Sequence, residues 1–276
     1  DAGEVRVDTG FMVFNRPNYP LLSALFAHLG IAAYPTRMSF SASFDGGRME
    51  YAGSDLNGLF GQRSNLTRLS FWRLIRSILR FNRIAEAALD APPPTDERLS
   101  AFLDRHGFDA DFRQQYLYPM SAAIWSSPSQ RIADFPATAF LRFFANHGLI
   151  RLRDRPQWLT VEGGSRSYLD RLIGDLGDRD ATGVDVVIAG GHRDRFDDVI
   201  LACHSDQALA LLDCAHDDER RILASIPYQP NRVLLHTDRA LMPLRRRVWS
   251  SWNYQRLGPG SGDPVSVTYW MNSLQR

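Results

Sequence analysis

The amino-acid sequence predicts an α/β fold with α+β insertions, in which two domains are interleaved along the chain rather than placed end to end. Three observations predict it: strand-like segments near the start, a middle block with helical spacing, and strand-like segments that return beyond position 158. With 276 residues, 44% of them hydrophobic, the chain is long enough to bury a sizeable core.

The N-terminal region predicts a strand, a loop, a helix and then a hairpin. Apolar residues over 5–14 favour the strand, and a helix is expected over 21–29, closed by Gly30. Residues 38–44 alternate with period two, a turn of aspartate and two glycines follows, and 48–51 returns as the partner strand.

The middle of the chain predicts mostly helices. Apolar residues recur there at helical spacing, and a run of three prolines at 92–94 interrupts the pattern once. The expected helices cover 69–89, 99–106, 109–118 and 137–147.

The remainder predicts a second β-rich region. A strand ends near Val161, and a glycine turn then leads into a helix that runs to about position 176. Ser205 is expected to cap a further helix through Leu212. Strands are expected over 184–188, 193–196, 199–202, 233–237, 248–254 and 265–271.

Composition excludes several function classes. The formal net charge of +1 gives no overall field for nucleic acid, and the absence of lysine removes Schiff-base and P-loop lysine chemistry. The two cysteines have no metal-finger spacing, so no metal site is expected and a reducing compartment is favoured. No run of about eighteen apolar residues occurs. We therefore expect a cytoplasmic protein.

Three turns at strand ends have residue types suited to ligand binding. Small or hydrogen-bonding residues there allow a ligand to approach the backbone, although each turn could equally be a tight connection that satisfies its own amides. The candidates are Asp8, Thr9 and Gly10 in the first turn, Gly163, Gly164 and Ser165 in the second, and Ala202 and Cys203 in the third.

The three turns, in this order and separated by a helical block containing 116–125, resemble bacterial flavoproteins of the amine oxidase and phytoene desaturase superfamily. The resemblance covers most of the chain and implies FAD as the cofactor. It also implies an incomplete Rossmann-like FAD-binding domain over 1–33 and 153–226. A substrate domain of mixed sheet and helices would take 34–152 and 227–276.

The resemblance implies that Asp8, Thr9 and Gly10 lie beside the flavin and that the second and third turns line the FAD domain. The GxGxxG fingerprint of this superfamily occurs nowhere in the sequence. We therefore expect a chain truncated at both ends that binds FAD poorly by itself, the alternative being a degenerate protein that no longer binds FAD.

The implied activity is hydride transfer from a largely apolar organic substrate to the flavin, with no acid or base assigned. Four aromatic side chains are candidates to line the substrate cavity, although aromatic residues are more often core: Tyr116, Tyr118, Trp125 and Trp270. Two alternatives remain: a non-catalytic lipid or protein binding module on a degenerate flavoprotein frame, and an oxidase of a polar amine that needs a carboxylate or aromatic cage.

One predicted helix has a basic face. Arg73, Arg76, Arg80 and Arg83 follow at spacings of three, four and three, and no acidic residue occurs between Arg68 and Ile84. Such a face can contact an anionic membrane peripherally, or it can be a solvated surface above a buried apolar stripe.

Overall fold

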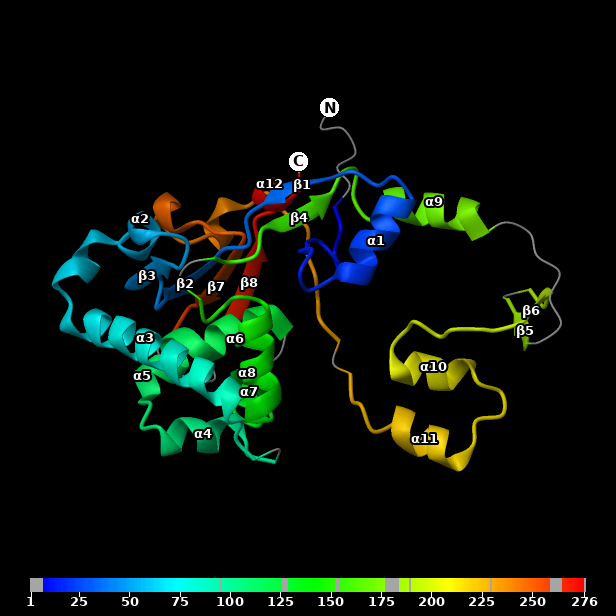
Figure 1. The fold of residues 1–276 in the computed structure, drawn as a ribbon. Helices are drawn as coiled ribbons and strands as arrows, with labels where there is room; N and C mark the ends of the chain where they lie inside the picture. Colours follow the sequence, from blue (N-terminus) through cyan, green and yellow to red (C-terminus); the bar gives the residue numbers. More distant parts are fainter. Residues whose placement is uncertain are drawn as a thin grey trace. The chain divides into compact units, whose positions relative to one another are not determined.

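The computed structural model describes residues 7–94, 96–125, 129–151, 154–176, 184–188, 190–228, 230–258 and 265–275. The chain divides into a larger unit, Asp1–Arg171 with His236–Arg276, and a smaller unit, Leu172–Leu235 (Figure 1). These boundaries differ from the predicted domain boundaries. The assignment of 1–33 and 153–226 to a flavin domain remains a prediction.

A four-stranded sheet in the order β3-β2-β7-β8 organises the larger unit. Its strands are β2 (Phe40–Phe44), β3 (Met49–Ala52), β7 (Trp252–Arg256) and β8 (Val265–Tyr269). The predicted β2–β3 hairpin is confirmed, and its turn has positive φ at Asp45, Gly46 and Gly47. β2 also pairs in parallel with β7, which places Phe40 opposite Trp252.

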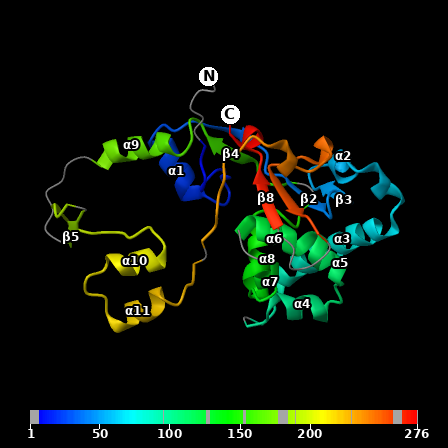
Figure 2. The ribbon, with the colours of Figure 1, turned by 180° about the vertical axis from the view of Figure 1, so that it is seen from behind.

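Helices of the middle block lie along one side of this sheet in both views (Figure 1, Figure 2). α6 contacts β7, and α3 contacts α5 and α8. The helices and helical turns are α2 (Leu56–Leu59), η1 (Arg63–Thr67), α3 (Leu69–Asp90), α4 (Leu99–Arg105), α5 (Ala110–Phe112), η2 (Arg113–Leu117), α6 (Tyr118–Trp125), α7 (Ser129–Ile132) and α8 (Ala137–Asn146).

The main core lies between the sheet and these helices. Phe44, Tyr51 and Tyr254 from the sheet join buried side chains of α3, α4 and α8 in one apolar cluster. The expected helices at 69–89, 99–106 and 137–147 are confirmed within a residue or so. The expected end at Tyr118 is wrong, because η2 is a π-helical turn that carries the helix on to Trp125.

A buried carboxylate links the β2–β3 hairpin to the C-terminal part of the larger unit by hydrogen bonds and an ion pair. Glu50 on β3 is fully buried and accepts hydrogen bonds from the backbone N–H groups of Leu244 (2.7 Å) and Arg245 (3.2 Å). The Ser43 hydroxyl (2.9 Å) and the Arg245 guanidinium (2.8 Å) also donate to it. Four donors, one of them the Arg245 cation, replace the water that this carboxylate loses on burial.

A smaller layer of the larger unit holds the first and second candidate turns. The antiparallel pair β1 (Ala33–Thr36) and β4 (Trp158–Val161) packs with α1 (Pro20–His28) around Phe14, Phe26 and Leu159. α9 (Arg166–Leu176) follows, and its Arg171 donates to the carbonyl of Leu29 at the end of α1 (2.8 Å). The strand expected over 5–14 is reduced to one bridge between Phe14 and Leu159, within the described residues.

The described residues of the C-terminal part of the larger unit include three short helical segments. They are η3 (Arg239–Leu241), η4 (Arg246–Val248) and α12 (Met271–Leu274). The strand expected from Val248 begins only at Trp252, because the Ser250 and Ser251 backbone forms the approach to β7, with Ser250 N–H bonded to the Asn253 side chain (2.9 Å).

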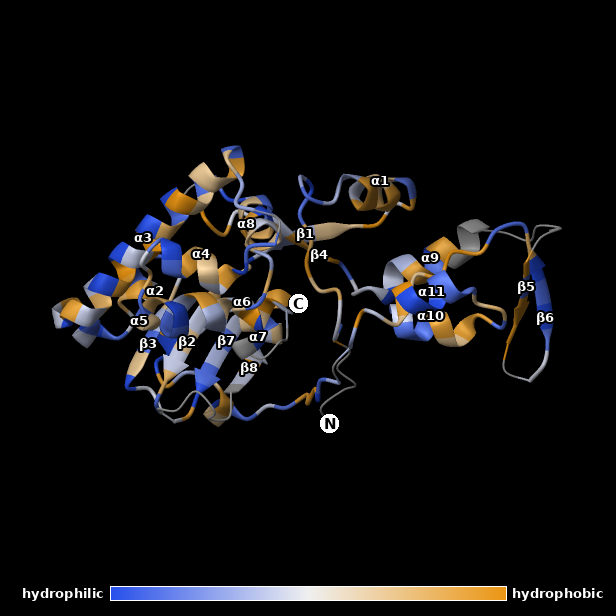
Figure 3. Ribbon diagram, turned by 90° about the horizontal axis from the view of Figure 1, so that it is seen from below, coloured by the Kyte–Doolittle hydropathy of each residue, from blue (hydrophilic) through white to orange (hydrophobic). Residues whose placement is uncertain are grey.

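The smaller unit contains the hairpin β5 (Val184–Val187) and β6 (Arg193–Phe196) and the helices α10 (Ser205–Leu211) and α11 (Asp217–Leu223). Figure 3 colours β5 hydrophobic and β6 hydrophilic. The strands expected over 199–202 and 233–237 are wrong: both stretches are exposed and have no strand partner among the described residues. The expected cap is also wrong, because His204 is the N-cap of α10 and the Ser205 hydroxyl donates to the Leu223 carbonyl.

Candidate functional site

The first and second candidate turns meet in the structure. The backbone N–H of Ser165 donates to both carboxylate oxygens of Asp8, at 3.1 and 3.0 Å, across 157 positions of sequence. The Ser165 hydroxyl donates to the carbonyl of Phe11 at 3.1 Å. The two turns therefore form one structural element at the start of α9.

A third segment joins this element. The Asp8 N–H donates to Oε1 of Gln275 at 3.0 Å, and Nε2 of Gln275 donates back to the Asp8 carboxylate. The carboxylate thus receives two N–H groups, from Gln275 and from Ser165 at the N-terminal end of α9, where the helix dipole also favours a negative charge. Sequence reasoning missed Gln275, because nothing local marks a glutamine at a distance of 267 positions.

Glycine is required at the second turn. Gly163 and Gly164 have φ of +78° and +77°, a region that side chains rarely allow. A Cβ on Gly164 would lie 3.2 Å from a carboxylate oxygen of Asp8. These glycines therefore allow the backbone at the start of α9 to come close enough to bind Asp8. This is a structural role that requires no ligand.

Thr9 and Gly10 differ from the rest of the element because both are exposed. A Cβ placed on Gly10 would meet no atom of the described residues within 4 Å. The backbone there is open to a flat ligand, whereas the Ser165 N–H is already bonded to Asp8. The residues present therefore fit contact with the ring system of a flavin, and they offer no GxGxxG cradle for its pyrophosphate.

A buried donor lies close to this element in the sequence. The side chain of Asn15 is fully buried, and its Oδ1 accepts from the Asn18 N–H at 3.0 Å. Its Nδ2 has no hydrogen-bond partner among the described residues. An ordered water or a ligand could satisfy this buried amide.

Ala202 and Cys203 belong to the smaller unit. Both are exposed and precede α10, where the His204 ring stacks on Tyr228 with centroids 4.2 Å apart. The convergence of this third turn with the first two therefore remains a prediction.

The four aromatic candidates fall into different environments. Trp125 packs among phenylalanines, with ring centroids 4.8 Å from Phe143 and 5.1 Å from Phe135, and thus contributes to the core. Tyr118 is buried, Tyr116 is half-buried, and Trp270 packs edge-on against Trp249. Their role in lining a substrate cavity remains a prediction.

Burial perturbs the tyrosines of this core. It raises the pKa of Tyr116 to about 12, and nearby Arg155 offsets part of the effect. The pKa of Tyr51 is raised well above its ordinary value, first by burial and then by Tyr116 and Tyr254. Tyr51 donates its hydroxyl to the Gln115 carbonyl at 2.6 Å, which favours its neutral form.

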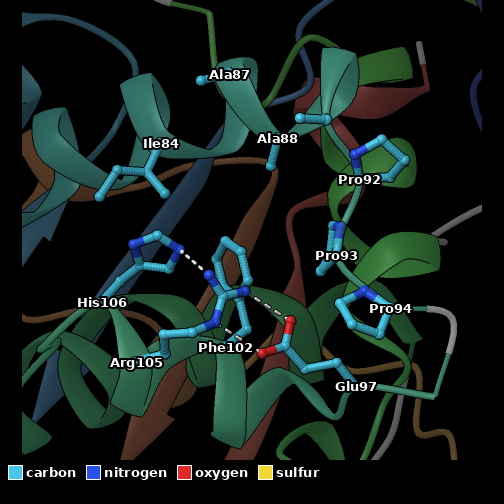
Figure 4. Close-up of a pocket in the computed structure, with 11 residues that line it drawn as sticks. Ile84, Ala87, Ala88, Pro92, Pro93, Pro94, Glu97, Phe102, Arg105 and His106 are labelled. Atoms are coloured by element: carbon cyan, nitrogen blue, oxygen red, sulfur yellow. Dashed lines mark hydrogen bonds and ion pairs between the residues drawn. The ribbon is translucent and has the colours of Figure 1, made fainter.

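A hollow of about 740 Å³ lies between the end of α3, the proline run and α4 (Figure 4). Apolar side chains such as Ile84 and Phe102 line it, with an Arg105–Glu97 ion pair of 2.8 Å at its polar side. Burial and the adjacent Arg105 lower the pKa of His106. Sequence reasoning noted the prolines only as a helix break and missed the hollow.

The described part of the chain contains no group of three or more histidine, cysteine, aspartate or glutamate side chains able to hold a metal ion. None of its helices combines the length and the apolar character needed to cross a bilayer.

Comparison with known protein families gives a match over nearly the whole chain. The family model described as flavin containing amine oxidoreductase matches residues 1–274, whereas the search of curated proteins found no match. A solved structure of a putrescine oxidase redesigned in cofactor binding aligns at 16% identity and a TM-score of 0.48. That alignment covers 76% of this chain and 51% of the other, so the chain spans about half the length of the putrescine oxidase. The match to the family model shows that the chain belongs to the flavin-containing amine oxidoreductases, which confirms the resemblance stated above and FAD as the cofactor.

Proposed function

We propose that this chain forms part of an FAD-dependent oxidoreductase that removes hydride from a largely apolar organic substrate. The observation that carries the proposal is the meeting of Asp8 with Ser165, which joins two turns that the family resemblance assigns to the flavin site. Membership of a flavin-containing family supports the reaction type. The apolar substrate rests on the aromatic candidates of the helical block.

The parts of this element have separate roles in the proposal. Asp8, Ser165 and Gln275 hold the turns together by hydrogen bonds, whereas Thr9 and Gly10 present exposed backbone toward the flavin ring. The bound flavin supplies the hydride acceptor, so the chain need only bind, orient and exclude water. No side chain here is required as a general acid or base.

Gly10 offers a direct test. Because a Cβ there meets no atom of the residues that the structure describes, we expect Gly10→Val to leave the fold intact yet fill the space through which a ring would approach. We expect its FAD dissociation constant, measured by quenching of flavin fluorescence on titration, to rise at least about tenfold, the loss of about 1.4 kcal/mol of contact.

Gly53→Val is the matched control. Gly53 is also exposed, has no positive φ, and its Cβ would lie 3.9 Å from the Phe40 carbonyl. Equal FAD affinity of both variants and the unchanged chain would refute contact at Gly10. If a polar diamine bleached the bound flavin anaerobically and apolar amines or alkenes did not, the apolar substrate class would be refuted. The proposed reaction type would stand.

A further inference from the structure

The outer face of α3 combines arginine with exposed apolar side chains. At 3.6 residues per turn, positions 69, 72, 73, 76, 79, 80 and 83 fall on one side of a helix, within an arc of roughly 120°. In the structure these residues are all exposed: Leu69, Trp72, Arg73, Arg76, Leu79, Arg80 and Arg83. The opposite face is buried in the main core through Phe71, Leu74 and Phe81.

Most of these arginines lack a partner among the residues that the structure describes. Among the described residues, no ion pair or hydrogen bond joins the side chain of Arg73, Arg76 or Arg83 to another group. Arg80 differs, since it donates to the Gly107 carbonyl at 2.9 Å and lies 4.3 Å over the Phe108 ring. Three cations are thus free to bind anions from outside.

A shallow hollow accompanies this face. About 450 Å³ is enclosed by the four arginines together with Ser77, Leu79 and Asp109. Among the described residues that line it, Asp109 is the one acidic residue, and its carboxylate caps α5 by accepting from the Phe112 N–H at 2.8 Å. The hollow is therefore positively charged overall and has room for a phosphate head group.

The apolar side chains distinguish a bilayer from a soluble anion. Leu69 is 76% exposed, Trp72 43% and Leu79 37%, and they lie among the arginines rather than beneath them. The Trp72 indole N–H donates to the Leu66 carbonyl at 2.9 Å, which fixes the ring at the surface. A free phosphate gains nothing from such side chains, whereas a lipid surface buries them.

We propose that the outer face of α3 docks on a bilayer that contains anionic lipids, with the helix lying parallel to the membrane surface. The 22-residue helix is roughly 33 Å long, and hydrophilic and hydrophobic colours alternate along its length (Figure 3). Arginines bind the phosphate head groups, and Leu69, Trp72 and Leu79 enter the boundary of the acyl region. This inference does not depend on the proposed function.

The test is flotation of the chain with vesicles of phosphatidylcholine, with or without phosphatidylserine. We expect binding only with phosphatidylserine and a decline as salt is raised, because screening weakens the head-group contacts. The triple variant Arg73→Gln, Arg76→Gln and Arg83→Gln, which spares the structural contacts of Arg80, should lower the partition coefficient roughly 100-fold, at about one factor of five per arginine.

A second triple variant controls for net charge. Arg16→Gln, Arg37→Gln and Arg232→Gln removes the same charge from exposed arginines outside α3 and should leave binding unchanged. Circular dichroism should show equal folding of both variants, since all six side chains are exposed. Leu69→Gln with Leu79→Gln should weaken the binding that persists at high salt.

Several results would overturn the proposal. They are equal flotation with neutral and anionic vesicles, the same loss of binding in both triple variants, and no effect of the leucine changes. Retention of the chain by an acidic peptide but not by anionic vesicles would assign the arginine face to a protein partner instead.

Discussion

The larger and smaller units differ in what stabilises their secondary structure. In the larger unit, the sheet and helices α3, α4 and α8 share one apolar core. In the smaller unit, Ala208 is the only buried residue among those whose side chains are described, and Ile200 is 90% exposed. The same types of element thus occur with and without a core beneath them.

The smaller unit holds its elements by local hydrogen bonds. α11 has a capping box in which the His216 N–H donates to Glu219 at 2.7 Å, and β5–β6 is a hairpin closed by two glycines. Helices of seven residues are marginal without packing. Local sequence signals therefore specify where an element lies in the chain, whereas burial of its side chains supplies most of its stability.

The largest expected effect comes from opening the core. Phe81 is fully buried against Phe108 and Phe112, so Phe81→Ala should cost about 3–5 kcal/mol of unfolding free energy. Phe196→Ala on β6, where the ring is 46% exposed, should cost less than about 1 kcal/mol. Urea unfolding followed by circular dichroism measures both, and equal costs would contradict the contrast between the units.

A second test compares a buried ion pair with an exposed one. Glu50→Ala leaves two backbone N–H groups, a hydroxyl and Arg245 without their acceptor, at a cost of about 3 kcal/mol. The pair Asp218–Arg221 in the smaller unit is 2.9 Å long but exposed, so Asp218→Ala should cost at most about 0.5 kcal/mol. A small loss of unfolding free energy for Glu50→Ala would show that the carboxylate does not stabilise the fold.

The smallest expected effect is a loss of folding stability at alkaline pH. Because the folded pKa of Tyr116 is about 12 against an ordinary 10, its neutral form stabilises the fold fully below pH 10, and this contribution is lost as pH rises toward 12. The loss should be on the order of 1–2 kcal/mol. Ultraviolet titration should show one fewer late-titrating phenol in Tyr116→Phe. Titration of that phenol near its ordinary value would place it outside the core.

The sequence predicted elements whose signals are local. The hairpin of β2 and β3 follows from alternation and an aspartate-glycine-glycine turn, and α3 from helical spacing over six turns of chain. The strands expected over 199–202 and 233–237 failed because an apolar run becomes a strand only when another strand bonds to it. No residue within either run reports whether such a strand is present.

The candidate site was predictable only in part. Glycines between a strand and a helix marked the turn at 163–165, and the resemblance linked it to Asp8. Sequence patterns did not predict the hydrogen bonds of Gln275 and Glu50 to distant residues, nor the unsatisfied amide of Asn15. Each depends on which distant backbone groups come near, and sequence spacing does not encode that.

The parallel pairing of β2 with β7 has a consequence for biosynthesis. Ser41 and Asn253, which face each other across this pair and hydrogen-bond at 2.8 Å, are 212 positions apart. Ser41 leaves the ribosome well before Asn253. The edge of β2 that pairs with β7 therefore stays unpaired while the helical block is synthesised. Slow folding and a need for protection from aggregation during synthesis follow for this half of the sheet.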